Sequence, residues 1–163
     1  MKHTNKKGFT IVELVIVIAV IAILAAVLIP NLSRLVTKAD KSAAMQEAKA
    51  AMDNDLINAE GDLANMTKYA TADTQYYIVK EVSKYNETVT SDSGNVIIAV
   101  TSSTVTASPS NTVEGAKYYE AHAYEGKYTV ASNVGTYEYT TKDQKFVCKL
   151  VTGGEWVITE AGN

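Results

Sequence analysis

The stretch Lys6-Lys7-Gly8-Phe9-Thr10-Ile11-Val12-Glu13-Leu14 decides how the rest of the chain is organised. Glu13 is the only charged residue between Lys7 and Arg34, and every residue from Leu14 to Ile29 is apolar. A helix from Phe9 to Ile29 would be about 32 Å long, which is close to the ~30 Å hydrocarbon core of a bilayer. The stretch therefore predicts a membrane-spanning helix that begins beside a lone carboxylate.

Basic residues precede this apolar segment. Lysines before a membrane span favour a cytoplasmic N-terminus, and here they are Lys2, Lys6 and Lys7. An ordinary secretory signal peptide and an uncleaved membrane anchor are two other interpretations of such a segment. Against the signal peptide, residues 14–30 contain no Ala-x-Ala cleavage site, and a helical pattern follows them directly.

Apolar residues recur at helical spacing beyond Pro30, so we expect the helix to continue through residues 32–61. Charged residues, Asp53 and Asp55 among them, fill most of the other positions. Gly61 is expected to follow the C-cap of the helix. One apolar stripe comprises Leu32, Leu35, Val36, Ala39, Ala43, Ala50 and Ile57, and a second comprises Met45, Ala48, Met52, Leu56 and Ala59.

Pro30 lies inside the predicted helix. A proline lacks the backbone N–H, and its ring clashes with the carbonyl four residues earlier, which here belongs to Ala26. A kink or a local break is therefore expected near residues 26–30. Membrane helices tolerate such a proline.

The residues after Gly61 are expected to form a globular domain, residues 62–163. Around Lys80–Lys84 the pattern favours a short helix that begins near Thr74. Beyond it, alternation and turn signals predict an antiparallel sheet. Its strands are expected at residues 96–100, 117–124, 127–131, 136–141, 145–151 and 155–159, with a weaker strand near Val105. The predicted fold class is α+β, a long N-terminal helix packed on a C-terminal antiparallel β-sheet.

Two sets of side chains are expected to share a face of this sheet, because alternate residues of a strand point the same way. Phe146, Cys148 and Leu150 form one set, which we place against the long helix, and Tyr137 and Tyr139 form the other. The ten tyrosines of the chain are interpreted mainly as packing residues of strands. Subunit contact or adhesion is the alternative.

Composition limits the functions that the chain can have. Its net charge is −3, and loss of residues 1–8 would leave 12 basic against 18 acidic residues, a net charge of −6. This argues against nucleic-acid binding by a broad basic surface. Cys148 is the only cysteine, so an intrachain disulfide is impossible.

The sequence does not resemble that of an enzyme or a metal protein. After loss of residues 1–8 the chain would keep one histidine, His122, which is interpreted as structural, and Cys148 is interpreted as a core residue. Asp53, Asp55 and Glu60 resemble a calcium loop only superficially, because they lie on a predicted helix without the required glycine. We therefore expect no catalytic residues, no metal and no cofactor.

The N-terminal motif resembles that of type IV pilins and their pseudopilin relatives. Gly8, Phe9, Glu13 and Pro30 all fall at the family's positions, and the resemblance extends over about residues 6–61. It implies that a prepilin peptidase cuts between Gly8 and Phe9, that Phe9 is N-methylated, and that Glu13 takes part in subunit assembly. It also implies that the segment around Pro30 bends or loses helicity in a filament. The lone cysteine fits a major pilin of Gram-positive bacteria better than the many Gram-negative pilins that carry a disulfide.

The resemblance further implies a life cycle. Residues 1–8 are a cleaved leader, residues 9–31 span the membrane and later form the filament core, and the C-terminal domain lies outside the cell. The implied partners are identical subunits, the peptidase and the assembly machinery in the membrane, and the implied product is an extracellular pilus that serves adhesion, motility or biofilm formation. The alternatives are a type II secretion pseudopilin, a competence pilin and, from another class, a membrane-anchored ligand-binding receptor.

Overall fold

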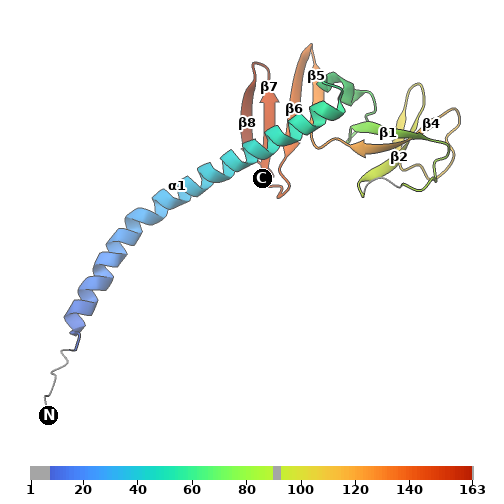
Figure 1. Ribbon diagram of the computed structural model, residues 1–163. Coiled ribbons are helices and arrows are strands. Elements are labelled where there is room, and N and C mark those ends of the chain that lie inside the picture. The colour runs from blue at the N-terminus through green and yellow to red at the C-terminus, as the bar shows by residue number, and fades with distance from the viewer. Residues whose placement is uncertain (1–7, 90–92, 163) are drawn as a thin grey trace. The chain divides into compact units, whose positions relative to one another are not determined.

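The computed structural model describes residues 8–89 and 93–162. Helix α1 runs from Ile11 to Asn58, and the chain divides after Ser42 into two compact units. The first unit holds the apolar turns of α1. The second holds the last turns of α1 and all the strands (Figure 1).

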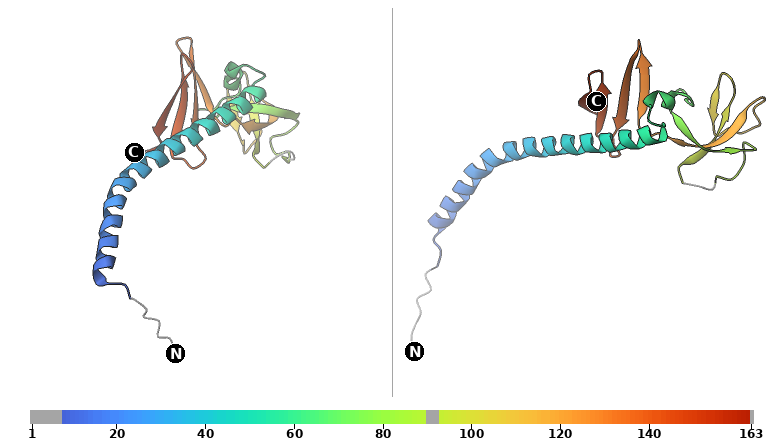
Figure 2. Two further views of the ribbon diagram at one scale, coloured as in Figure 1. Left: turned by 60° about the vertical axis from the view of Figure 1, so that its left-hand side comes forward. Right: turned by 45° about the horizontal axis from the view of Figure 1, so that its top comes forward.

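The second unit contains two four-stranded antiparallel sheets. The first has the order β1-β4-β2-β3, and the second is a meander with the order β5-β6-β7-β8. In both views of Figure 2, the last turns of α1 lie along the meander sheet. The strands are β1 (Tyr76–Val82), β2 (Asn95–Val100), β3 (Val105–Ala107), β4 (Lys117–Ala123), β5 (Lys127–Ala131), β6 (Val134–Thr140), β7 (Phe146–Val151) and β8 (Glu155–Glu160).

The α+β fold class is confirmed, and the strands from β2 onward lie within two residues of their predicted bounds. Two expectations are wrong. The predicted single sheet is divided into two, and the segment from Thr74 that was expected to be helical contains β1. Tyr76-Tyr77-Ile78-Val79 is rich in aromatic and β-branched residues, which favour strands, and β1 pairs with the central strand β4 along its length.

The buried glutamine Gln75 joins the two sheets. Its side chain donates from Nε2 to the carbonyl of Tyr128 at 2.7 Å and accepts from the N–H of Tyr128 at 2.9 Å. The carbonyl of Gln75 also accepts from the N–H of Tyr124. A side-chain amide thus satisfies both backbone groups of a residue on β5, as a neighbouring strand would.

Helix α1 ends in two interlocking hydrogen bonds. The N–H of Gly61 donates to the carbonyl of Leu56 at 2.9 Å, and that of Glu60 donates to Ile57 at 3.2 Å, which is the pattern of a Schellman motif. Glu60 has a φ of 57° and therefore holds the left-handed position that was expected for Gly61. The left-handed residue therefore comes one position earlier than predicted, and α1 itself ends at Asn58. The short 3-10 helix Leu63–Thr67 follows, capped by the side chain of Asp62.

The face of α1 that packs on the sheet agrees with the second predicted stripe, in which Ala48 and Ala59 are buried and Met52 packs against the core, but not with the first. Its buried residues in the second unit are Ala44, Ala48, Ala51 and Asp55. Ala43, Ala50 and Ile57, which belong to the first predicted stripe, are exposed. Ala44, Ala48 and Ala51 are small, so they allow the helix to approach the sheet closely.

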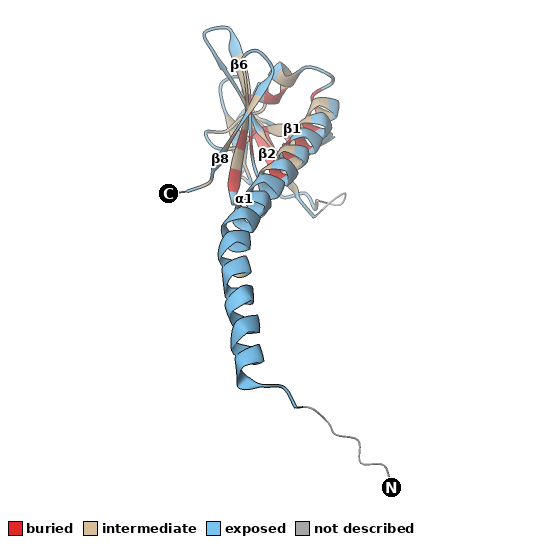
Figure 3. Ribbon diagram, turned by 90° about the vertical axis from the view of Figure 1, so that its left-hand side faces the viewer, coloured by how far each residue is buried: buried red, intermediate tan, exposed pale blue. Residues whose placement is uncertain are grey.

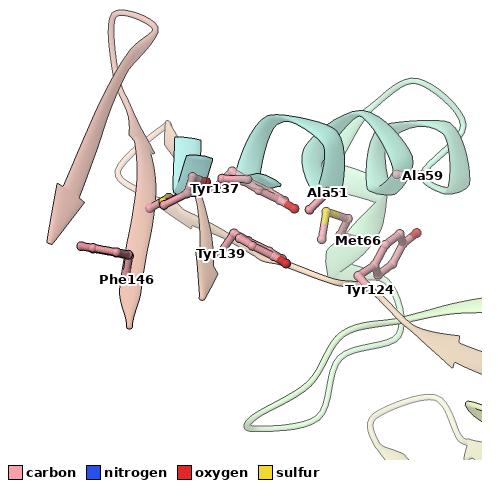
Figure 4. Packing of buried hydrophobic residues seen from close by; sticks show 10 residues of the cluster. Ala51, Ala59, Met66, Tyr124, Tyr137, Tyr139 and Phe146 are labelled. Carbon is pink, nitrogen blue, oxygen red and sulfur yellow. Dashed lines mark hydrogen bonds between the residues drawn. The ribbon is translucent and has the colours of Figure 1, made fainter. Parts of the chain in front are cut away.

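Tyrosines from the meander sheet and alanines from α1 form the main core (Figure 4). Phe146 and Cys148 belong to it with Leu150 packed beside them, so the prediction that this face meets the helix is confirmed. A second cluster lies on the other sheet and comprises Val82, Ile97, Ala99 and Tyr118. The members of the main core are Ala44, Ala48, Ala51, Ala59, Met66, Tyr124, Tyr137, Tyr139, Phe146 and Cys148.

Candidate functional site

The segment from Gly8 to Glu13 is the first candidate site. Phe9 is 89% exposed, and a Cβ atom added to Gly8 would meet nothing within 4 Å. The fold of a single chain therefore gives no reason for a glycine at position 8. The leader lysines Lys2, Lys6 and Lys7 lie outside the described residues.

Glu13 and Thr10 cap the N-terminus of α1. Oε2 of Glu13 accepts from the N–H of Thr10 at 2.9 Å and from its hydroxyl at 2.8 Å, and Oγ1 of Thr10 accepts from the N–H of Glu13 at 3.3 Å. This reciprocal pair is a capping box. Sequence reasoning missed Thr10, although threonine three residues before glutamate is the signature of this motif.

The apolar turns of α1 bury almost none of their surface in the first unit. Ile11, Leu14, Ile18, Ile23 and Leu28 are each more than half exposed, and Figure 3 shows this part of the helix coloured as exposed. The helix is long and apolar enough to cross a membrane, and none of its most apolar window is buried. Such a surface requires lipid or other helices around it.

Pro30 lies within α1, and the helix continues through it. Two polar side chains that follow the proline donate to backbone carbonyls one turn earlier, before the proline. Nδ2 of Asn31 bonds to the carbonyl of Val27 at 3.2 Å, and the hydroxyl of Ser33 bonds to that of Ile29 at 3.2 Å. The helical hydrogen bond that the proline removes is the one to the carbonyl of Ala26, which neighbours Val27 in the chain. A kink, or melting within a filament, stays a prediction.

Asp55 attaches α1 to the meander sheet, although the sequence analysis placed it on the polar face. It is 1% exposed. Its oxygens accept from the N–H of Glu125 at 2.9 Å, the N–H of Gly126 at 2.7 Å and the hydroxyl of Tyr137 at 2.8 Å. Burial raises the pKa of this carboxyl, and the three hydrogen bonds oppose that shift.

Gly126 fits this arrangement because only glycine leaves room for the ring of Tyr137. A Cβ atom at Gly126 would overlap the ring of Tyr137, whose hydroxyl binds the same carboxylate oxygen as the N–H of Gly126. The buried carboxylate of Asp55 therefore binds both the turn before β5 and Tyr137 of β6.

Glu47 makes a parallel contact two turns earlier on α1. Its Oε1 accepts from the hydroxyl of Tyr139 at 2.7 Å and from the N–H of Lys142 at 2.9 Å. Burial, followed by the hydrogen bond to Glu47, raises the pKa of Tyr139, and burial with the nearby Asp55 raises that of Tyr137. Two carboxylates eight residues apart on the helix thus hold two tyrosines that lie two residues apart on β6.

Potentially reactive side chains occupy structural positions. Cys148 is fully buried on β7, where its Sγ lies 3.5 Å from the carbonyl of Ala44, and burial raises its pKa. His122 lies on β4 of the other sheet. Its Nδ1 is 2.6 Å from Oδ1 of Asn95, and its ring packs on Tyr77. Cys148 as a core residue is therefore confirmed, and His122 lies on a strand as predicted, where its structural role stays an interpretation.

A charged network lies beside His122. Glu120 is fully buried, pairs with Nζ of Lys80 at 3.0 Å and accepts from Nδ2 of Asn95 at 2.7 Å. These contacts join β1, β4 and β2 across one face of their sheet. Because Lys80 and Asn95 both bind the same carboxylate, the network satisfies a charge that would otherwise destabilise the sheet.

The suspected calcium-loop residues do not converge. Asp55 is buried against the sheet, whereas Asp53 and Glu60 are exposed. Within residues 8–89 and 93–162, no group of three or more His, Cys, Asp or Glu side chains has the arrangement of a metal site.

Comparisons with known proteins bear on the N-terminal segment alone. A model of the prokaryotic N-terminal methylation motif matches residues 3–29. The type IV wide pilus major component PilA4 of Thermus thermophilus is 82% identical over 28 residues, which are 17% of this chain and 21% of that protein. The matched segment thus spans about a fifth of the length of that relative. No solved structure matches the chain.

Proposed function

We propose that the chain is the major structural subunit of an extracellular type IV pilus, because its N-terminal segment carries the prokaryotic methylation motif and is similar to that of a type IV pilus major component. The single observation that carries the proposal is this motif at the head of a helix whose apolar face is exposed. Lipid can cover that face before assembly, and the helices of identical subunits can cover it afterwards.

In this proposal a prepilin peptidase removes residues 1–8, and Phe9 becomes the methylated N-terminus. The exposure of Gly8 and Phe9 supports access by an enzyme. Intact mass and N-terminal sequencing of the surface protein test the step. Gly8→Leu should block cleavage and leave the precursor in the membrane. Finding the leader retained in filaments would contradict the proposal.

Glu13 has two roles in the proposal. In one subunit it caps α1 through Thr10. In the filament it pairs with the charged N-terminal amine of Phe9 of a neighbouring subunit. A carboxylate inside an apolar span is unfavourable by roughly 2.5–3.5 kcal/mol at its centre and by less near its end. Breaking a buried pair by removing one partner destabilises by about 3–5 kcal/mol.

The capping role and the pairing role can be separated by mutation. Glu13→Ala removes both, so filaments should be lost while membrane insertion and cleavage persist. Thr10→Ala removes the two hydroxyl bonds of the cap, keeps the backbone bond to Glu13 and leaves the carboxylate, so filaments should still form. If Thr10→Ala abolished filaments as completely as Glu13→Ala, capping alone would explain Glu13. Normal filament yield from Glu13→Ala would reject the pairing role and show that assembly does not need the cap.

The filament itself decides between the proposed function and its alternatives. Before assembly the subunit would span the cell membrane once with its N-terminus in the cytoplasm, and the assembly machinery would then extrude it. We propose that the pilus serves adhesion, motility or biofilm formation. Shearing surface filaments and identifying their main subunit tests the proposal, because a pseudopilin, a competence pilin or a membrane-anchored receptor would not be that subunit.

A further inference from the structure

The second unit has an open groove beside the exposed side of α1. Its volume is about 530 Å³, and helix residues Ala50, Asp53 and Ile57 line it with Tyr139 of β6 and Lys142 of the turn after β6. Ile57 is 76% exposed, and Ala50 is also exposed. These two residues belong to the apolar stripe that the domain's own sheet leaves uncovered.

The groove carries more acidic than basic groups. Glu47, Asp53 and Glu125 line it, against the single ammonium group of Lys142. Glu47 is held by Tyr139 and by the N–H of Lys142, and Glu125 accepts from Nδ2 of Asn54 at 3.1 Å. Two of the three carboxylates are thus fixed at the groove by hydrogen bonds. A ligand for this surface should present positive charge next to apolar side chains.

The first unit presents such a surface on α1. Arg34, Lys38 and Lys41 are spaced by four and three residues, so they lie on one side of the helix. Leu35 and Val36 lie beside this basic stripe and are 63% and 50% exposed. The basic stripe and its apolar neighbours match the groove in charge and in character.

We infer that the acidic groove of one subunit receives the basic stripe Arg34, Lys38 and Lys41 of a neighbouring copy of this chain. The inference rests on the proposed filament, and it names the surface through which adjacent subunits set their offset. Identical helices in register would place like charges side by side. An axial offset instead places the basic stripe of one helix beside the acidic groove of the next, which favours one register among many.

Charge reversal tests the inference in the full chain. Lys38→Glu and Asp53→Lys should each lower the yield of sheared filaments several-fold, while the amount of processed subunit in the membrane stays constant. The double variant should restore most of the yield. Lys84→Glu, at an exposed position outside both surfaces, is the matched control and should not change it.

Two outcomes of this experiment have distinct meanings. If filaments form and neither reversal lowers their yield, or the double variant is no better than the worse single one, the inference is rejected and the proposed function stands. If the unmodified chain forms no filaments at all, the proposed function fails first.

Cysteine cross-linking locates the contact without relying on charge. Cys148 is fully buried, so filaments of the unmodified chain should give no covalent ladder on oxidation. Ile57→Cys should be combined in turn with Leu32→Cys, Leu35→Cys and Val36→Cys. At least one pair should produce a ladder of covalent oligomers, whereas Thr129→Cys with Leu35→Cys should produce none. Filaments without a ladder from any of the three pairs would reject the inference.

Discussion

The two parts of α1 use apolar residues in opposite ways. In the first unit, isoleucine, leucine and valine cover the helix and stay exposed. In the second, alanines, two carboxylates and the partly buried Met52 make the contact with the sheet, and Ile57 is exposed. Hydrophobicity along this helix therefore predicts contact with lipid or with other chains better than it predicts burial within the subunit.

Small residues and carboxylates suit the sheet for a physical reason. Alanine brings the helix backbone close to the rings of Tyr137 and Tyr139, which supply the buried area that alanine lacks. Asp55 and Glu47 then bind the hydroxyls of the same two tyrosines. Each hydroxyl needs a partner when it is buried, and these pairs fix where the helix lies along β6.

The largest expected effect concerns the attachment of the last turns of α1. A chain that begins at Lys38 keeps Ala44 to Ala59 and should be soluble, monomeric and folded. A chain that begins at Asp62 exposes Tyr137, Tyr139 and Phe146 and should aggregate or stay unfolded. Circular dichroism and the dispersion of amide signals in NMR spectra measure the difference. A well-dispersed spectrum from the shorter chain would overturn the helix-on-sheet comparison.

The next effect separates the two aspartates of this part of the helix. Asp55→Ala leaves the N–H groups of Glu125 and Gly126 and the hydroxyl of Tyr137 without their buried acceptor. It should destabilise the second unit by roughly 3–5 kcal/mol. Asp53→Ala, at an exposed position of the same helix, should change stability by less than about 0.5 kcal/mol. Urea unfolding of the chain that begins at Lys38 measures both, and equal effects would contradict the assignment.

The contrast between Asp53 and Asp55 also shows which structural features the sequence alone predicts and which it does not. The motif around Gly8 and Glu13 and the strands from β2 onward were predictable, because each depends on local residue order. The burial of Asp55 was not, because it depends on Tyr137, which lies 82 residues away. A periodicity argument assigns an aspartate to the solvent side unless a distant partner is known.

The division of the sheet into two was hidden for a related reason. The side chain of Gln75 binds the backbone N–H and carbonyl of Tyr128, as a neighbouring strand would. No pattern near Gln75 in the sequence predicts that contact. β1 was misassigned because lysine and glutamate around Lys80 suit a helix, whereas pairing with β4 overrides that local preference. Thr10, in contrast, could have been found from its spacing to Glu13.

Alkaline pH should weaken the contact between the helix and the sheet. Burial, together with the nearby Asp55, raises the pKa of Tyr124 to about 12, and burial raises the pKa of Tyr137 and Tyr139 as well. An unfolded tyrosine loses its proton near pH 10. Raised pKa values in the folded state stabilise it fully below pH 10, and that contribution is lost as pH rises toward 12.

Tyr137→Phe tests this dependence. Between pH 10 and 12 each such tyrosine can lower stability by up to about 1.4 kcal/mol per pH unit, so the variant should lose less stability than the parent over the same range. Comparison of the two slopes removes the effect of lysine titration, which is common to both. Urea midpoints measured at each pH provide the slopes, and identical slopes would argue against the burial of Tyr137.

The smallest effect compares two alanines on opposite sides of α1. Ala48 is fully buried in the core, and Ala50 is exposed beside the groove. Ala48→Leu forces three extra carbon atoms between the helix and the sheet and should destabilise the second unit by about 1–3 kcal/mol. Ala50→Leu meets no core and should change stability by less than about 0.5 kcal/mol.

If the groove receives a neighbouring copy, the same Ala50→Leu substitution should lower filament yield although the isolated domain unfolds normally. A loss of domain stability from Ala50→Leu that equals that from Ala48→Leu would mean that the two sides of the helix are not distinct.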